Sequence, residues 1–439
     1  MSADLSTTSG AEITVEEPPM PQPAHPKSLL YLVGVLAGGN ILATALRTIG
    51  AIIQGRFVGP AVLGLFNGIG LALGYAPLLQ LGVLNALNRE LPYYFGKGDQ
   101  KQVQELASAA QAWTIALGGS AAIGMLVVSV SYLATGDFQR CAGWATNVVL
   151  VFTLFYSNNY LQMTYRTSHD FARLAVVNVM VNVLSLLLLV LAALLSFYGL
   201  CLRQLIVELT SLSLLYYFRP VRVGPKWSTK HFKHLLMVGL PIFGAGQLYA
   251  LWSVLDRTLV FRLAGNEGMG LYSQAVTIMT AMEMLPLALS QVIYPRMAEK
   301  YAKTGRMAGL VQMASKPTLL ATAGMIPVIA VSWWLVGPAI QLVLPKYVAA
   351  VPVIRWTMLI PFVSALASIN VFFPVARRLG LYTVAILTGI AAYGFALLWL
   401  TRNEVSLIAF AQAMLVGRIV FVLVSFCFIG LLVHRERQG

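Results

Sequence analysis

The sequence contains little charge. Asp, Glu, Lys and Arg make up 10% of the 439 residues, whereas hydrophobic residues make up 58%. A soluble globular domain carries roughly 25% charged residues, so this chain cannot cover a core of its size with polar surface. The shortage excludes a soluble protein and also a soluble domain with a single membrane anchor. It predicts a polytopic membrane protein.

Cysteine and histidine are scarce as well. The three cysteines lie in or beside apolar runs, which excludes a disulfide framework or a cysteine metal site. The five histidines, at positions 25, 169, 231, 234 and 434, fall in the N-terminal tail or in polar breaks. The sequence shows no P-loop, nucleophile elbow or metal-binding pattern. We therefore expect a protein that is not an enzyme and that binds neither a metal nor a cofactor.

Basic residues are absent from the first 26 positions, which hold four acidic residues and five prolines. Such a segment cannot bury apolar area, so we expect residues 1–27 to be a disordered cytoplasmic tail. The segment lacks the basic region and the cleavage site of a signal peptide. The first apolar run should therefore remain as a helix of the mature protein.

Apolar stretches recur along the rest of the chain. A membrane core of about 30 Å needs about 20 apolar residues per helical crossing. The sequence predicts twelve such spans, near residues 30–53, 61–87, 106–134, 142–164, 174–197, 200–218, 236–262, 269–293, 317–337, 349–373, 381–401 and 404–433. The fold class is thus an all-α membrane protein.

The basic residues indicate the orientation, because Lys and Arg accumulate in cytoplasmic loops. Twenty of the 30 basic residues fall in one alternate set of polar breaks and in the termini, and four fall in the other set. This asymmetry predicts that both termini are cytoplasmic, and it accounts for most of the formal net charge of +14. A nucleic-acid partner would need a folded basic domain, which the chain lacks.

The chain also contains a weak internal repeat at an offset of 206 residues. Segment 56–105 aligns without gaps on 262–311, which pairs Gly59 with Gly265 and Gly64 with Gly270. An offset of six helices relates two halves of the same orientation, as in transporters that move two bundles around a central site. We therefore expect a six-helix bundle at 28–218, a basic linker at 219–234, a second bundle at 235–433 and a cytoplasmic C-terminus at 434–439.

Four stretches carry a resemblance to a known family. They are "GRFVGPAVLGLFNGIGLALGYAPLLQLGVLNALNREL" followed by "GKGD", "DRTLVFRLAGNEGMGLYSQA", "IYPRMAEKYAKTG" and "LVLPKYVAAVPVIRW". Here the chain resembles the oligosaccharide or O-antigen flippases, the polysaccharide branch of the multidrug/oligosaccharidyl-lipid/polysaccharide (MOP) exporter superfamily. The resemblance implies a MATE-like V of two six-helix bundles in the bacterial cytoplasmic membrane, with the cleft lined by helices 1, 2, 7 and 8. It also implies a polyprenyl-diphosphate-linked oligosaccharide as substrate, and polysaccharide polymerase or export machinery as partners.

Ionisable residues inside the spans are candidates for the binding site, because they are costly in a membrane and usually face a cavity or a partner. These candidates comprise six arginines and three carboxylates, so positive charge remains even if every carboxylate is paired. Guanidinium groups suit the oxygens of a diphosphate. The candidates for diphosphate binding are Arg47, Arg257, Arg355 and Arg418. Arg47 is favoured because its repeat position, Ser253, lies one helical turn from Asp256 and Arg257.

Polar and aromatic side chains on the expected cleft helices are weaker candidates for contacts with the sugars, and packing explains each of them as well. They are Asn40, Tyr75, Asn85, Gln247, Tyr249 and Trp252. The acids Asp256, Glu283 and Glu208 could pair with arginines or couple transport to protons or Na⁺.

The predicted function is a flippase that moves an O-antigen or exopolysaccharide repeat unit by alternating access, surrounded by membrane lipids. The first alternative is a cation-coupled drug or metabolite antiporter on the same fold, which an acidic cluster would favour. A membrane-embedded sugar transferase or ligase would need a buried histidine or a large outer loop. A cell-wall precursor flippase usually resembles this architecture with two further helices.

Overall fold

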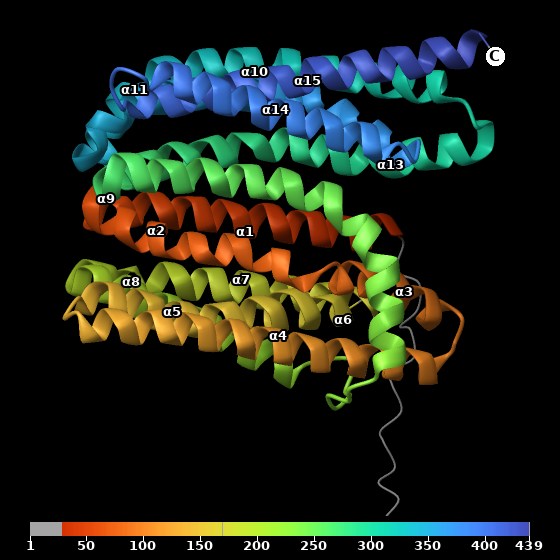
Figure 1. The fold of residues 1–439 in the computed structure, drawn as a ribbon, viewed down its shortest axis with the longest axis horizontal. Coiled ribbons are helices and arrows are strands. Elements are labelled where there is room, and N and C mark those ends of the chain that lie inside the picture. Colours follow the sequence, from red (N-terminus) through yellow and green to blue (C-terminus); the bar gives the residue numbers. More distant parts are fainter. Residues whose placement is uncertain (1–28, 169, 439) are drawn as a thin grey trace, which may run out of the picture.

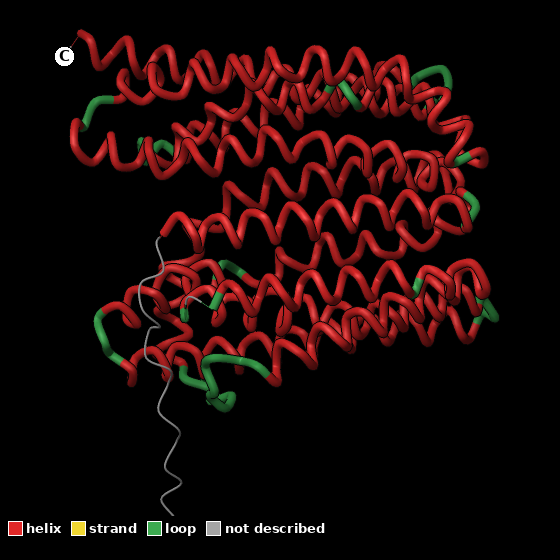
Figure 2. Tube along the Cα trace, turned by 180° about the vertical axis from the view of Figure 1, so that it is seen from behind, coloured by secondary structure: helices red, strands yellow, loops and turns green. Residues whose placement is uncertain are grey.

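The computed structural model describes residues 29–168 and 170–438, and within these ranges the chain is helical and contains no strand (Figure 2). The predicted tail at 1–27 lies outside the described residues. The first half of the chain forms α1 (Leu29–Phe57), α2 (Pro60–Tyr75), η1 (Ala76–Gln80), α3 (Val83–Gly96), α4 (Gln100–Ala134), α5 (Phe138–Thr153), η2 (Leu154–Leu161), α6 (Gln162–Thr167), α7 (Phe171–Leu187) and α8 (Leu189–Tyr217).

The second half begins with a helix of 76 residues. Its elements are α9 (Thr229–Thr304), α10 (Met307–Val343), η3 (Pro345–Ala350), α11 (Val351–Thr357), α12 (Ile360–Leu366), η4 (Ala367–Val371), α13 (Phe372–Val375), α14 (Leu379–Leu400) and α15 (Leu407–Gln438). In Figure 1, α1–α8 lie together, and most of α9 lies with α10–α15 on the other side. We call these the first and the second group.

Two of the predicted loops are sharp breaks inside continuous helical segments. Ser196 breaks α8 with φ 50° and ψ −118°, and Gly265 breaks α9 with φ 69° and ψ −168°. Glycine suits the second break because it adopts positive φ without strain. With these breaks, the described helices account for the twelve predicted crossings, and seven helices within the described ranges are long and apolar enough to span a membrane by themselves.

The bundle has two distinct ends (Figure 1). The basic end carries the α3–α4 connection, the stretch 219–228, the α9–α10 connection and the α13–α14 connection. The distal end carries the α1–α2 turn, Gly265 and the α14–α15 connection. Helix α9 begins at Thr229, inside the stretch 219–234 that the sequence marks as a linker, and α15 continues to Gln438, through the stretch expected as a C-terminal tail.

The two groups meet at the distal end through glycines. A Cβ atom added to Gly64 would overlap the carbonyl oxygen of Asn266 and lie 2.6 Å from the amide nitrogen of Gly270. A Cβ atom added to Gly270 would overlap the carbonyl of Pro60. Pro60 and Asn266 are themselves 206 residues apart, as are Gly64 and Gly270. Each half therefore makes the same contact with the other, which is the reciprocity expected of a two-fold interface.

A second pair of contacts obeys the same offset. A Cβ atom on Gly68 would overlap the ring of Phe261, and one on Gly55 would lie 2.8 Å from the side-chain nitrogen Nε2 of Gln274. Gly55 and Phe261 are 206 residues apart, and so are Gly68 and Gln274. The distal contact is completed where the Tyr347 hydroxyl donates to the carbonyl of Val58 at 2.9 Å. The contacts support an internal repeat whose axis passes between α2 and α9.

The N-terminal part of α9 packs on the first group before the helix bends to join the second (Figure 1). Two histidine–carboxylate pairs hold it there, His231 Nε2 with Glu105 at 3.2 Å and His234 Nε2 with Glu90 at 3.3 Å. Gly239 also packs against the backbone of α3 near Gly82. Residues 229–240 are called the α9 arm below.

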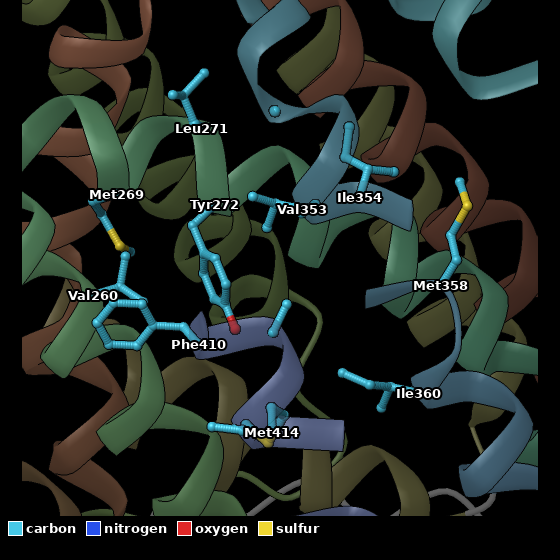
Figure 3. Packing of buried hydrophobic residues seen from close by; sticks show 14 of the residues in the cluster. Val260, Met269, Leu271, Tyr272, Val353, Ile354, Met358, Ile360, Phe410 and Met414 are labelled. Carbon is cyan, nitrogen blue, oxygen red and sulfur yellow. The ribbon is translucent and has the colours of Figure 1, made fainter. Parts of the chain in front are cut away.

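The largest apolar core lies in the second group and reaches α2. Tyr272 of α9 lies among side chains of α11 and α15, beside Val353 and Phe410 (Figure 3). All three side chains are buried. This core fixes the part of α9 that borders the cavity described next.

Candidate functional site

A cavity of about 430 Å³ lies between α2, α5, α8 and α9, so helices of both groups line it. Ligand pockets usually measure about 300–1,000 Å³. Its lining residues are Phe66, Asn67, Gly70, Leu71, Leu73, Gly74, Gly143, Asn147, Leu150, Gln204, Val254, Arg257, Met269, Ser273, Val276 and Thr277. We call it the central cavity.

Arg257 is the one charged side chain in this lining. Helix α9 positions it, and its Nε donates to the carbonyl of Ser253 one turn earlier at 3.1 Å. Within the described residues, Arg257 forms no ion pair with a carboxylate. The rest of its guanidinium can therefore donate to an anion in the cavity.

Neutral polar groups surround this cation. Asn67 comes from α2, Ser273 and Thr277 come from α9, and Asn147 and Gln204 come from α5 and α8. The Asn147 amide donates to the carbonyl of Ile69 at 2.9 Å, which holds α5 against α2. Amide and hydroxyl groups both donate and accept hydrogen bonds. The cavity thus combines one positive charge with groups that suit sugar hydroxyls.

Three further predicted residues gather behind the cavity wall. Arg418 of α15 is 5% exposed and lies over the rings of Tyr249 and Trp252, with its Cζ 4.4 and 4.9 Å from their centroids. It also donates to the Ser253 hydroxyl at 3.4 Å. Trp252 is 0% exposed and packs against Gly389 and Gly417. In this conformation Trp252 and Arg418 are packing residues, not lining residues, because α14 and α15 cover Trp252 and Arg418 packs on Trp252 and Tyr249.

Asp256 is held by two tyrosines. It is 2% exposed and accepts hydrogen bonds from the hydroxyls of Tyr272, at 2.8 Å, and Tyr393, at 3.0 Å. These donors come from another stretch of α9 and from α14. Asp256 therefore ties three helical segments together and does not line the central cavity. Hydroxyl groups thus supply both hydrogen bonds to the Asp256 carboxylate.

The other two acids lie apart from Asp256. Glu208 of α8 accepts from Asn158 at 3.3 Å and from Gln204 at 3.4 Å. Its charged neighbour is Arg47, which is exposed on α1. Glu283 accepts from the Ser364 hydroxyl at 2.7 Å. The structure thus associates Arg47 with Glu208 of the first group.

The remaining predicted residues are dispersed. Arg355 lies near the distal end beside Trp333, 5.8 Å from its ring centroid. The Tyr75 hydroxyl shares a hydrogen bond of 2.7 Å with Thr258, which links α2 to α9. Asn85 is half-buried on α3, and Gln247 lines a second cavity. Asn40 lies on α1, and its side chain is outside the described part of the structure.

The sequence reasoning did not single out Asn147, Gln204, Ser273 or Thr277. Each is an isolated polar residue in an apolar helix. Helices α5 and α8 correspond to the fourth and sixth predicted spans, which were not expected to line a cleft. The available indication was their cost in a membrane, which is smaller for a neutral side chain than for a charged one. Only the packing of α5 and α8 against α2 brings Asn147 and Gln204 to the cavity, whereas Ser273 and Thr277 lie on α9.

Comparisons with known proteins concern the family and the fold of the chain. Residues 99–352 match a family model described as "Polysaccharide biosynthesis protein". No curated protein matches the chain in sequence.

Solved structures share the fold at low identity. An inward-facing multidrug resistance MATE family transporter of the MOP superfamily matches with a TM-score of 0.72 and 15% identity, over 90% of this chain and 96% of that chain. The outward-facing conformation matches with 0.62 and 16%, over 93% and 96%. A MATE protein in the straight conformation matches with 0.64 and 15%, over 93% and 97%. The chain therefore belongs to the family of polysaccharide biosynthesis proteins and has the fold of the MATE transporters of the MOP superfamily.

Proposed function

We propose that the protein is a flippase that moves a polyprenyl-diphosphate-linked oligosaccharide across the bacterial cytoplasmic membrane. The observation that carries the proposal is Arg257, a cation that forms no ion pair with a carboxylate among the described residues, in a cavity that both groups line. A diphosphate supplies the missing negative charge, and Asn67, Asn147 and Gln204 offer hydrogen bonds to the first sugar. The family supports a substrate that belongs to polysaccharide synthesis.

The difference between the two ends of the bundle supports transport by alternating access. The glycine contacts hold the groups together at the distal end. The fold is also more similar to the inward-facing MATE structure than to the outward-facing one, with TM-scores of 0.72 and 0.62. With the basic end in the cytoplasm, the central cavity receives the headgroup from the cytoplasmic leaflet. The two groups then rock so that the distal contact opens and the headgroup leaves on the other side.

The test measures on which side of the membrane the sugar lipid lies. Cells that lack the gene are complemented with the wild type, with Arg257→Gln or with the matched control Arg262→Gln. Arg262 is exposed at the distal end of the same helix. Lipid-linked oligosaccharides are then quantified with a lectin confined to the outer face. A charge-assisted hydrogen bond contributes about 1.5–3 kcal/mol, so Arg257→Gln should lower outward transport about tenfold or more, and the control should not.

The rival function is a cation-coupled drug or metabolite antiporter, because the solved structures of this fold include multidrug transporters. It predicts efflux of a cationic dye that depends on a proton or Na⁺ gradient, with no change in sugar-lipid sidedness. Unchanged sugar lipids in the deletion strain would refute the flippase proposal. Loss of Glu208, which accepts hydrogen bonds from Asn158 and Gln204, should then abolish efflux.

A further inference from the structure

A second cavity, of about 570 Å³, lies at the basic end between η1, α9 and α14. It is separate from the central cavity, because the two share no lining residue. Its lining residues are Leu78, Leu240, Phe243, Gly244, Gln247, Leu248, Leu251, Leu379, Gly380 and Thr383. We call it the basic-end cavity.

The lining suits a hydrocarbon chain. Eight of the ten residues are apolar or glycine, and the two polar ones, Gln247 and Thr383, are uncharged. Leu240, at its edge, is 51% exposed. A hydrocarbon chain is stabilised when its apolar surface leaves water for such a lining, and the bilayer around the protein is a source of such chains.

Two arginines stand next to this lining. Arg377 and Arg378 directly precede Leu379, the first residue of α14, and both are exposed. They join an apolar pocket to a local positive charge of two. A ligand that matches both features carries a lipid chain attached to phosphate, because guanidinium groups bind phosphate oxygens well.

The basic-end cavity also leads toward the central one. Leu251 of α9 lines the basic-end cavity, and Val254, one turn further along the same helix, lines the central cavity. A lipid bound in the basic-end cavity therefore lies one helical turn of α9 away from the lining of the central cavity. This arrangement suits a loading position on the cytoplasmic side.

We propose that the basic-end cavity binds the polyprenyl chain of the substrate next to its diphosphate, while Arg377 and Arg378 bind the phosphates. The proposal rests on the proposed function and adds a site that is occupied before the headgroup reaches the central cavity. The basic-end cavity recognises the polyprenyl chain, not the sugar.

Two glycines allow a test that fills the cavity without a clash. A Cβ atom added to Gly244 or to Gly380 would meet no atom within 4 Å. Gly244→Phe or Gly380→Phe therefore places a ring in the cavity and leaves the backbone undisturbed. Gly246→Phe is the matched control, because Gly246 is equally open, lies on the same helix and does not line the cavity.

The probe is a benzophenone-tagged polyprenyl monophosphate that carries no sugar, in phosphatidylcholine vesicles with the purified full-length protein. Photolabelling of peptides from α9 and α14 should fall about tenfold in Gly244→Phe, a change that corresponds to about 1.4 kcal/mol. Gly246→Phe should label like the wild type. Joint replacement of Arg377 and Arg378 by glutamine should also lower labelling, whereas Arg402→Gln at the distal end should not.

Wild-type labelling in both cavity-filling variants would overturn the proposal. So would equal displacement of the probe by the same amount of phosphatidylglycerol, because the cavity would then be a general site for phospholipid. The sugar-free probe separates this result from the flippase assay. Labelling at these peptides with unchanged sugar-lipid sidedness would refute the transport function and leave the chain site standing.

Discussion

The glycine contact at the distal end makes a prediction about the balance between the two transport states. In Gly64→Ala, the new methyl group would lie 2.6 Å from the amide nitrogen of Gly270 and closer still to the carbonyl of Asn266. Atoms in good contact lie about 3.5–4.0 Å apart, so relief of the overlap with the Asn266 carbonyl requires α2 and α9 to separate by about 2 Å. Overpacking of this kind costs about 1–3 kcal/mol.

That cost falls on the closed distal end alone, so it shifts the population toward a distal-open state by about 5- to 150-fold. Gly270→Ala should have the same effect, because it is the repeat partner and its Cβ atom would overlap Pro60. The matched control is Gly124→Ala on α4 of the first group, where a Cβ atom would meet nothing within 4 Å and which does not line the central cavity. A protein biased toward one state should also flip its substrate more slowly.

The assay measures the distance between two spin labels at the distal end by pulsed electron paramagnetic resonance. The labels replace Arg140 in the first group and Arg402 in the second, in a protein whose native cysteines have been changed to serine. Both arginines are exposed. The long-distance population should increase in Gly64→Ala and Gly270→Ala but not in Gly124→Ala. An unchanged distance distribution in a folded Gly64→Ala protein would refute the assignment of this contact as a gate.

Two further predictions concern stability and use the thermal midpoint of the purified protein in detergent. Tyr272→Phe removes one of the two donors to buried Asp256 and should cost about 1–3 kcal/mol; an unchanged midpoint would mean that Tyr393 alone satisfies the carboxylate. Glu436→Ala removes the carboxylate that accepts from the amides of Met307 and Ala308, at 2.6 and 2.7 Å, and should cost about 1 kcal/mol; a midpoint equal to that of the wild type would show that water replaces this cap.

The sequence predicted the architecture well because the membrane imposes length and composition on each crossing. The twelve spans and the turns near Gly59 and Gly265 follow from local patterns, and the internal repeat aligned Gly64 with Gly270 without showing that the two glycines are in contact. The continuity of α9 through Gly265 did not follow, since one residue with positive φ reverses the chain without an intervening loop. A sequence pattern does not distinguish such a break from a short loop.

The site was predicted less completely, for reasons of packing. The sequence singled out Arg257, which lines the central cavity, because charge in a span is conspicuous. It could not show that Arg418 approaches Ser253 across 165 positions, or that this arginine is buried against Tyr249 and Trp252 of α9. Nor could it show that Asn147 faces the cavity, because a single neutral polar residue in an apolar helix creates no periodic pattern that would indicate which face is polar.

The α9 arm has a mechanical consequence. His231 and His234 fasten residues 229–240 to the first group, while the remainder of the same helix is embedded in the core of the second. A rigid rod cannot stay attached to two bodies that rotate against each other, so any rocking must bend α9 between them. Gly244 and Gly246 lie in that interval with open space around them, and helices bend readily where side chains are small. The work of bending this segment then enters the free-energy difference between the two transport states. A stiffer helix here would favour one state even though the substrate never touches it.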